Sequence, residues 1–287
     1  MIISVFPNLM NNGVEELTYN VISALSKLDT KVYISSKYKD LFGKCNVLFD
    51  QEVKLIELCD IAIAIGGDGT TLNIAKKAAN KGKPVLGINA GRLGFMSGLE
   101  KDELELLNKV VLSDYSIDER LMLEAQIIDK DAKTVTASFK CLNDAVISRG
   151  NFARLIDIEI LSNGRNVSKM RADGIIISTP TGSTAYSMAA GGPVVSPEAD
   201  CIIATPICPH SLMDRSIIFS TDCELNIKAG NDKSDCPVLN IDGQEAIVLE
   251  EGQSVRIKVS DTKTKLIKIK PENFYEILNK KIIERRA

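Results

Sequence analysis

One short segment constrains the fold of this 287-residue chain more than any other. Residues Ile61–Ile65 are an unbroken apolar run, and a glycine-rich stretch, Gly66–Thr70 (GGDGT), follows at once. A short apolar run that ends at a turn signal is typical of a strand buried on both faces. The glycines permit a tight turn, and Thr70 or Thr71 is a suitable cap for a helix. The segment predicts a strand, a turn and a helix Thr71–Ala79, an arrangement that binds phosphate.

The first third of the chain repeats this alternation of strand and helix. The strand patterns are Ile2–Phe6, Lys31–Ser35 and Pro84–Ile88, and the helix patterns are Val14–Leu28 and Asp102–Leu112. Strands that alternate with helices indicate a parallel sheet with both faces covered. We therefore predict an α/β domain over residues 1–116.

From about Ile117 the pattern changes to short strands separated by turns. Examples are Leu121–Ile128, Thr134–Lys140, Ala145–Ser148, Ile156–Leu161, Ile175–Ser178, Ile202–Thr205, Glu224–Ile227, Val255–Val259 and Leu266–Ile269. Two helices interrupt the series, Ser183–Ala190 and Glu272–Ile283. We predict an all-β domain over residues 117–264, and a C-terminal segment, 265–287, whose helix returns to the first domain. Because ligand sites are common between domains, we expect the active site in the cleft between these two.

Composition excludes several classes of protein. The 35 Lys and Arg residues against 38 Asp and Glu leave a formal charge of −3, which argues against a nucleic-acid partner. No apolar run approaches the ~18 residues of a membrane span, and the first residues do not resemble a signal peptide, so we expect a cytoplasmic protein with no membrane partner. Seven cysteines without a C-x-x-C pair fit neither a disulfide scaffold nor a zinc site. The single histidine, His210, is expected to be structural or to line a site.

Asp68 is the chemically informative residue of the glycine-rich turn. A carboxylate that faces polyphosphate is repelled unless it accepts a proton, accepts a sugar hydroxyl or works with a metal ion. The alternative is structural, with Asp68 only capping a tight turn. A second segment, Arg171–Pro197, is dense in small and polar residues that let a flat ligand approach the backbone. Within it, Asp173 is a candidate acceptor and Tyr186 a candidate partner for a base or ribose, although Ser183–Ala190 is also compatible with a packing helix.

Taken in order, these motifs resemble those of bacterial NAD kinases, which use ATP or polyphosphate to phosphorylate the adenosine ribose 2′-hydroxyl of NAD. The resemblance covers nearly the whole chain and rests on GGDGT, on Gly91–Met96 (GRLGFM), on Asn143–Asp144, on Arg171–Pro197 and on Asn240–Gln244 (NIDGQ). It implies that Asp68 is the general base. It also places the following residues at the nucleotides: Gly66, Gly67, Asp68, Gly69, Thr70, Phe95, Asn143, Asp144, Arg154, Arg171, Asp173, Thr184, Ala185, Tyr186, Ser187, Met188, Ala189 and Gln244.

The resemblance further implies NAD and ATP or polyphosphate as substrates, and a homo-oligomer, either a dimer or a tetramer. We expect a divalent cation, Mg²⁺, to arrive bound to the donor phosphates, because the sequence contains no dedicated set of metal ligands. Two other functions remain open from the residues. A lipid kinase that shares GGDGT would need a lipid slot, and a noncatalytic NAD(P)-binding regulator would have no use for Asp68.

Overall fold

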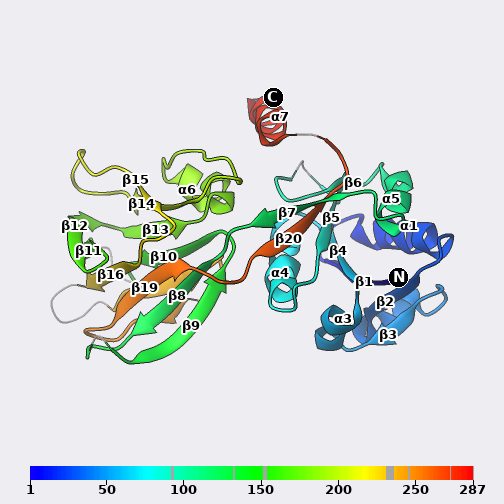
Figure 1. The fold of residues 1–287 in the computed structure, drawn as a ribbon, viewed down its shortest axis with the longest axis horizontal. Coiled ribbons are helices and arrows are strands. Elements are labelled where there is room, and N and C mark those ends of the chain that lie inside the picture. Colours follow the sequence, from blue (N-terminus) through cyan, green and yellow to red (C-terminus); the bar gives the residue numbers. More distant parts are fainter. Residues whose placement is uncertain are drawn as a thin grey trace. The chain divides into compact units, whose positions relative to one another are not determined.

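The computed structural model describes residues 1–91, 94–131, 133–150, 154–230, 236–244, 246–271 and 273–286, with side chains of the last helix through Lys281. Contacts divide the chain into two compact units (Figure 1). Unit 1 comprises Met1–Glu119 and Lys263–Ala287, and unit 2 comprises Arg120–Thr262. The first boundary falls later than residue 116 because Ser116–Arg120 forms a strand, β7, in the sheet of unit 1.

Unit 1 is built on an eight-stranded, mainly parallel sheet. Its order is β3 (Leu48–Asp50), β2 (Lys31–Ser35), β1 (Ile2–Pro7), β4 (Ile61–Gly66), β5 (Val85–Asn89), β20 (Thr264–Lys268) and β7, with β6 (Leu99–Glu100) beside β5. After β1, the chain adds β2 and β3 on one side of β1. It then returns to place β4 on the other side of β1 and adds β5 beyond it, so the order of the strands reverses between β1 and β4. In open parallel sheets, ligands bind beyond the carboxyl ends of the strands at such a reversal.

Unit 1 also contains helices. They are α1 (Val14–Ser26), α2 (Lys39–Phe42), α3 (Glu52–Leu58), α4 (Asp68–Ala79), α5 (Leu107–Val111) and α7 (Phe274–Arg286), with 3₁₀ turns at Ser36–Tyr38 and Leu104–Leu106. In α1 the buried residues Val14, Leu17, Val21 and Leu25 recur at helical spacing and pack on the apolar strands β1 and β4. Every residue of β4 is buried, which explains why its sequence is apolar without alternation.

Unit 2 consists of two six-stranded antiparallel sheets that enclose one core. The first contains β15 (Ile217–Ser220), β14 (Cys201–Ile207), β13 (Gly174–Ser178), β10 (Asp144–Ser148), β17 (Val238–Ile241) and β18 (Ile247–Val248). The second contains β12 (Arg165–Ala172), β11 (Ile156–Ser162), β16 (Leu225–Gly230), β19 (Ser254–Val259), β8 (Leu123–Ile128) and β9 (Val135–Cys141). The predicted fold class is confirmed: an α/β unit with a mainly parallel sheet, an all-β unit, and a C-terminal helix that belongs to the first.

Three predicted helices differ in the structure. Helix α4 starts at Asp68, so Thr70 and Thr71 lie in its first turn and neither is its cap. The segment Asp102–Leu112 is divided into a 3₁₀ turn and the short helix α5. The segment Ser183–Ala190 contains the end of a 3₁₀ turn, Thr181–Thr184, and one helical turn, α6 (Tyr186–Ala189), because the chain leaves helical geometry at Ala185 (φ −96°, ψ −125°).

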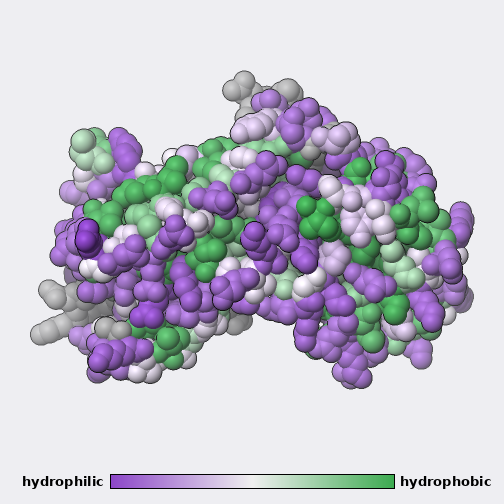
Figure 2. Space-filling model, viewed as in Figure 1, coloured by the Kyte–Doolittle hydropathy of each residue, from purple (hydrophilic) through white to green (hydrophobic). Residues whose placement is uncertain are grey.

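Hydrophilic residues cover much of the visible surface in Figure 2, with hydrophobic residues in smaller groups between them. The most exposed large apolar side chains include Met10, Leu212 and Met213. Among the residues that the structure describes, no helix has both the length and the apolar character needed to span a membrane.

Candidate active site

The glycine-rich turn after β4 is held by Thr70. A Cβ atom on Gly66 would lie 2.4 Å from Thr70 Oγ1, so only glycine fits there. The Thr70 hydroxyl in turn accepts a hydrogen bond from Asn8 Nδ2 at 3.2 Å, which connects the ends of β1 and β4. A Cβ on Gly67 or Gly69 would meet no protein atom within 4 Å, so packing does not demand glycine at these two positions. Both therefore leave the backbone accessible at the start of α4.

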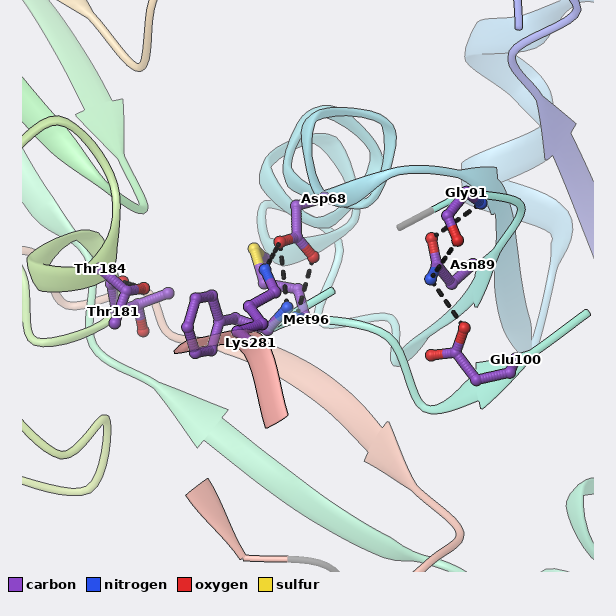
Figure 3. Close-up of polar contacts among 9 residues, drawn as sticks. Asp68, Asn89, Gly91, Met96, Glu100, Thr181, Thr184 and Lys281 are labelled. Atoms are coloured by element: carbon purple, nitrogen blue, oxygen red, sulfur yellow. Dashed lines mark hydrogen bonds and ion pairs between the residues drawn. The ribbon is translucent and has the colours of Figure 1, made fainter. Parts of the chain in front are cut away.

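The carboxylate of Asp68 is fixed by the backbone of the loop after β5. Phe95 N–H donates to Oδ2 and Met96 N–H donates to Oδ1, each at 3.0 Å (Figure 3). A Cβ on Gly94 would lie 2.5 Å from Oδ1, so glycine lets the loop approach the carboxylate this closely. Two backbone donors on separate oxygens set the plane of the carboxylate. Asp68 therefore has a defined orientation rather than that of a mobile surface acid.

A lysine from the C-terminal helix completes this cluster. Lys281 Nζ lies 3.3 Å from Asp68 Oδ2 and 3.8 Å from the centroid of the Phe95 ring. The Lys281 side chain is 16% exposed, whereas that of Asp68 is 36% exposed. No pattern in the sequence indicated this contact, because the two residues are 213 positions apart.

The loop that holds Asp68 is itself anchored at its base. Asn89 Nδ2 donates to Glu100 Oε2 at 2.7 Å, and Asn89 Oδ1 accepts from Gly91 N–H at 3.2 Å (Figure 3). Burial raises the pKa of the Glu100 carboxyl, and the hydrogen bond from Asn89 opposes that shift. The family motif GRLGFM forms this loop, although two of its residues, Arg92 and Leu93, lie outside the described part of the chain.

A hollow of about 380 Å³ opens beside the turn, at the reversal between β1 and β4. Gly69, Thr70 and Asn73 line it from α4, and Asn8 and Lys37 line it from the ends of β1 and β2. The Lys37 ammonium contacts Glu52 Oε2 at 2.8 Å, and this hydrogen bond lowers the pKa of Glu52 against the opposing effect of burial. The hollow therefore places polar side chains and the Lys37–Glu52 ion pair next to the start of a helix.

In unit 2, Asn143 and Asp144 are held by the carboxylate of Asp242. Oδ1 of Asp242 accepts from the N–H groups of Asn143 at 2.7 Å and Asp144 at 3.0 Å, and Oδ2 accepts from Leu142 N–H at 3.0 Å. Asp242 and Gly243 both have positive φ, 51° and 70°, as the tight turn between β17 and β18 requires. Asp144 is 4% exposed and Asn143 is half-buried, and the Asp242 carboxylate accepts from the backbone N–H of both.

The small-residue segment after β13 packs against this pair. Thr179 N–H donates to Asn143 O at 2.9 Å, and Thr179 Oγ1 donates to Leu142 O at 2.6 Å. Ser187 is fully buried, and its hydroxyl is hydrogen-bonded to Thr205 Oγ1 at 3.0 Å, which gives it a packing role. Thr184, Ala185 and Met188 are partly exposed, whereas Tyr186 and Ala189 are exposed.

Arg171 and Asp173 lie at the other end of β13. That strand spans five residues, or roughly 17 Å at about 3.3 Å per residue, between Asp173 and Thr179. Here Asp173 Oδ1 contacts Arg149 Nε at 3.3 Å, and the Arg171 carbonyl accepts from His210 N–H at 2.8 Å. A hollow of about 710 Å³ at this end is lined by Arg171, His210, Ser211 and Asp214 among others.

The remaining two predicted residues are exposed. Arg154 lies before β11, and Gln244 follows the Asp242–Gly243 turn, where its carbonyl accepts from Asn240 Nδ2. Among the residues that the structure describes, no group of three or more His, Cys, Asp or Glu side chains could hold a metal ion.

Comparison with known proteins decides the family. Models of the ATP-NAD kinase N-terminal domain and C-terminal domain match residues 5–115 and 142–269 of this chain. The chain belongs to the NAD kinase family. It is 36% identical to an NAD kinase from Natranaerobius thermophilus, over 98% of this chain and 97% of that protein. It is 38% identical to an NAD kinase from Caldicellulosiruptor saccharolyticus, over 99% of this chain and 100% of that protein.

Solved structures share the fold. A crystal structure of yeast NADH kinase complexed with NADH superposes with a TM-score of 0.88 at 23% identity, covering 98% of this chain and 87% of that one. An NAD kinase from Archaeoglobus fulgidus in complex with ATP superposes with a TM-score of 0.76 at 24% identity, covering 98% of each chain. The family inferred from the motifs is thus confirmed, and the protein is an enzyme of the kinase class.

Apart from Arg154 and Gln244, the structure groups the predicted NAD kinase residues into three sets. Gly66–Thr70 and Phe95 surround Asp68 in unit 1, and Asn143, Asp144 and Thr184–Ala189 lie together in unit 2. Arg171 and Asp173 form a third set at the far end of β13. The sequence analysis assigned no role to Lys281 or Asp242. Only Asp242 carried a signal, because it lies in the motif Asn240–Gln244 and begins an Asp-Gly turn.

Proposed function

We propose that the enzyme transfers the terminal phosphoryl group of ATP or polyphosphate to the adenosine ribose 2′-hydroxyl of NAD and forms NADP. Asp68 acts as the general base. The observation that supports this role is the fixed orientation of its carboxylate by Phe95 N–H and Met96 N–H. A ribose hydroxyl is a weak nucleophile at neutral pH, and a positioned carboxylate that accepts its proton accelerates the transfer. The hydroxyl oxygen attacks the terminal phosphorus, the bridging P–O bond of the donor breaks, and Asp68 holds the released proton.

The carboxylate retains capacity for a substrate. An ionised carboxylate offers about four acceptor positions. Among the described residues, Phe95 N–H and Lys281 donate to Oδ2, and Met96 N–H donates to Oδ1. One acceptor position therefore remains on Oδ1 for the hydroxyl.

We place the donor phosphates in the hollow between the ends of β1 and β4. The accessible backbone at Gly67 and Gly69 supports this placement, since a helix N-terminus stabilises negative charge. Lys37 and the amides of Asn8 and Asn73 add donors from the wall of the hollow. The backbone amides of the turn would offset charge on the phosphoryl group as it transfers.

The divalent cation belongs with the donor in this proposal. Among the described residues the chain has no cluster of metal-ligating side chains, and both oxygens of Asp68 already accept N–H groups. Mg²⁺ keeps several waters and binds through substrate phosphates, where it neutralises their charge. We expect calorimetric titration of Mg²⁺ into the enzyme alone to show no tight site, whereas Mg²⁺ should tighten ATP binding. Excess chelator should abolish turnover with ATP, and full activity in metal-free buffer would overturn this assignment.

The set around Asn143 and Asp144 is proposed to bind NAD. Hydrogen bonds to Asp242 and from Thr179 hold the backbone of Asn143 and Asp144 in place. A binding site whose residues are already held in position suits specific recognition of a nucleotide. We also propose a cytoplasmic location, because the seven cysteines are free thiols, as expected in a reducing compartment.

Arg171 and Asp173 are proposed to serve the site of a neighbouring copy in a homo-oligomer. Their separation from Asn143 and Thr179 by the length of β13 supports this, as do the exposed Leu212 and Met213 at the same end of unit 2. If so, an Asp68→Asn chain and an Asp173→Ala chain, each weakly active alone, should regain activity when unfolded and refolded together. Refolded mixtures that are no more active than the separate variants would place Asp173 in its own subunit's site or in none.

Formation of NADP from NAD, measured with an NADP-specific dehydrogenase, tests the proposed reaction. ATP with Mg²⁺ and inorganic polyphosphate are supplied as donors in separate arms, and NADH and diacylglycerol replace NAD as acceptors. Product from NAD supports the proposal. Phosphorylation of diacylglycerol alone would indicate a lipid kinase, and NAD binding without product would indicate a noncatalytic regulator.

A further inference from the structure

Helix α7 delivers an ammonium group to the carboxylate of Asp68. The helix contacts the loop after β5 through Phe274, whose ring centroid lies 6.1 Å from that of Phe95. Lys281 follows Phe274 by seven positions, or about two helical turns, so both side chains lie on the same face of α7. Phe95 therefore contacts α7 twice, through the ring of Phe274 and through the ammonium of Lys281.

We propose that Lys281 is a positioning residue for phosphoryl transfer. Its ammonium holds Oδ2 of Asp68, so that the remaining acceptor position on Oδ1 faces the substrate hydroxyl. This inference rests on the proposed role of Asp68 as the general base. Lys281 moves no proton itself; it acts only through the orientation of Asp68.

The environment of Lys281 distinguishes it from the surface ion pairs of this chain. Among the lysines of the described ion pairs, Lys281 has the least exposed side chain, at 16%. Lys270 follows at 24%, and Lys37 is 54% exposed. Withdrawing an ammonium from water is unfavourable unless a charge or a ring face compensates for it. Asp68 and the Phe95 ring supply both forms of compensation at 3.3 Å and 3.8 Å. The position of the ammonium is thus fixed on two sides.

Three donors, two from adjacent residues of one loop and one from the C-terminal helix, then meet on one carboxylate. The Phe95 and Met96 amides each hold one oxygen of the carboxylate. The Lys281 ammonium adds a second, charged donor to Oδ2 and so strengthens the hold on this oxygen, while Oδ1 keeps its remaining acceptor position. A misplacement of about 1 Å in a reacting group lowers a rate by up to ~10²-fold, so a contact of this kind is sufficient to affect turnover.

The test is a double-mutant cycle measured on the full chain. Lys281→Met keeps the length of the side chain and removes the ammonium, and we expect kcat to fall by roughly 10- to 100-fold with little change in KM for NAD. In the Asp68→Asn background the same substitution should change kcat by less than about twofold, because the group that Lys281 orients is gone. Lys281→Arg should retain most of the activity. Lys280→Met, on the same helix with the same loss of charge, is the matched control and should behave as the wild type.

Chemical rescue separates positioning from docking of the helix. Ethylammonium added to Lys281→Ala should restore at least a tenth of the lost kcat, because it supplies an ammonium without repairing α7. Equal losses of kcat from Lys281→Met in both backgrounds, no rescue by ethylammonium, or wild-type kcat in Lys281→Met would each overturn the inference. Failure of the proposed function gives a different result: the wild type itself then makes no NADP, or Asp68→Asn alone has no effect.

Discussion

Asp68→Asn is expected to lower kcat by roughly 10²–10⁴, the usual contribution of a general base, while NAD binding largely persists. The amide of asparagine has nearly the shape of the carboxylate but does not accept the proton of a ribose hydroxyl. Asparagine also has only one side-chain oxygen, so one of the N–H groups of Phe95 and Met96 loses the acceptor that it has in the wild type. Because the side chain is partly exposed, we expect a loss of only about 1 kcal/mol in unfolding free energy.

Steady-state kinetics, thermal unfolding and NAD titration of the same preparation check this expectation. Asp60→Asn is the matched control, because the Asp60 carboxylate also accepts a backbone N–H, that of Ile2 at 2.7 Å, and lies in the same unit before β4. The control removes the same charge and should leave kcat unchanged. Turnover near that of the wild type in folded Asp68→Asn would remove Asp68 from the role of base.

Local signals in the sequence predicted the turn that carries Asp68. The strand Ile61–Ile65, the glycines and the following helix lie within twenty residues, so their pattern reports directly on short-range structure. The error at the start of α4 is equally local: the Gly67 carbonyl accepts from Thr70 N–H at 3.0 Å and from Thr71 N–H at 3.2 Å, which draws both threonines into the helix. Caps are decided by such backbone geometry rather than by the preference of one side chain.

Contacts that hold the candidate site arise from the tertiary fold and left little trace in the sequence. Asp242 meets Asn143 across 99 positions, and Lys281 meets Asp68 across 213. Strand β12 was missed because an edge strand tolerates the polar sequence RNVSKMRA, which lacks an alternating apolar pattern. The arrangement of Arg171 and Asp173 was hidden for another reason. The predicted strand Ile175–Ser178 already separates Asp173 from Thr179, but the family motif runs through both residues and so grouped them in one site.

Glycines show which parts of the site are constrained by the protein itself. At Gly66 and Gly94 an added Cβ would collide with Thr70 or with the Asp68 carboxylate, whereas at Gly67 and Gly69 it would meet nothing within 4 Å. The first pair shapes the turn and the loop. The second pair is unconstrained by packing, as expected of a backbone that a ligand approaches. The same criterion identifies a structural glycine in unit 2, at Gly182.

Gly182→Ala is expected to disrupt the Asn143 region more than any other single methyl group added in unit 2. The new Cβ would lie 2.1 Å from Asn143 O and 2.5 Å from its carbonyl carbon, so the obstacle is backbone and has no side-chain rotation to relieve it. Gly182 N–H also donates to Thr179 Oγ1 at 3.0 Å, so displacement of the turn strains the contact that Thr179 makes with Leu142 O. Overpacking of this kind typically lowers the unfolding free energy by about 1–3 kcal/mol.

Two measurements check this prediction, because the added Cβ should both destabilise the turn and displace the backbone of Asn143. Thermal unfolding should show a melting temperature lower by roughly 2–10 °C. Calorimetric titration should show NAD affinity reduced at least tenfold, since the Asn143 backbone leaves its position. Gly230→Ala is the stability control in the same unit: Gly230 ends β16, and a Cβ there would meet nothing within 4 Å, so this variant should keep the melting temperature of the wild type. Wild-type NAD affinity in a folded Gly182→Ala enzyme would show that NAD does not depend on the geometry of Asn143.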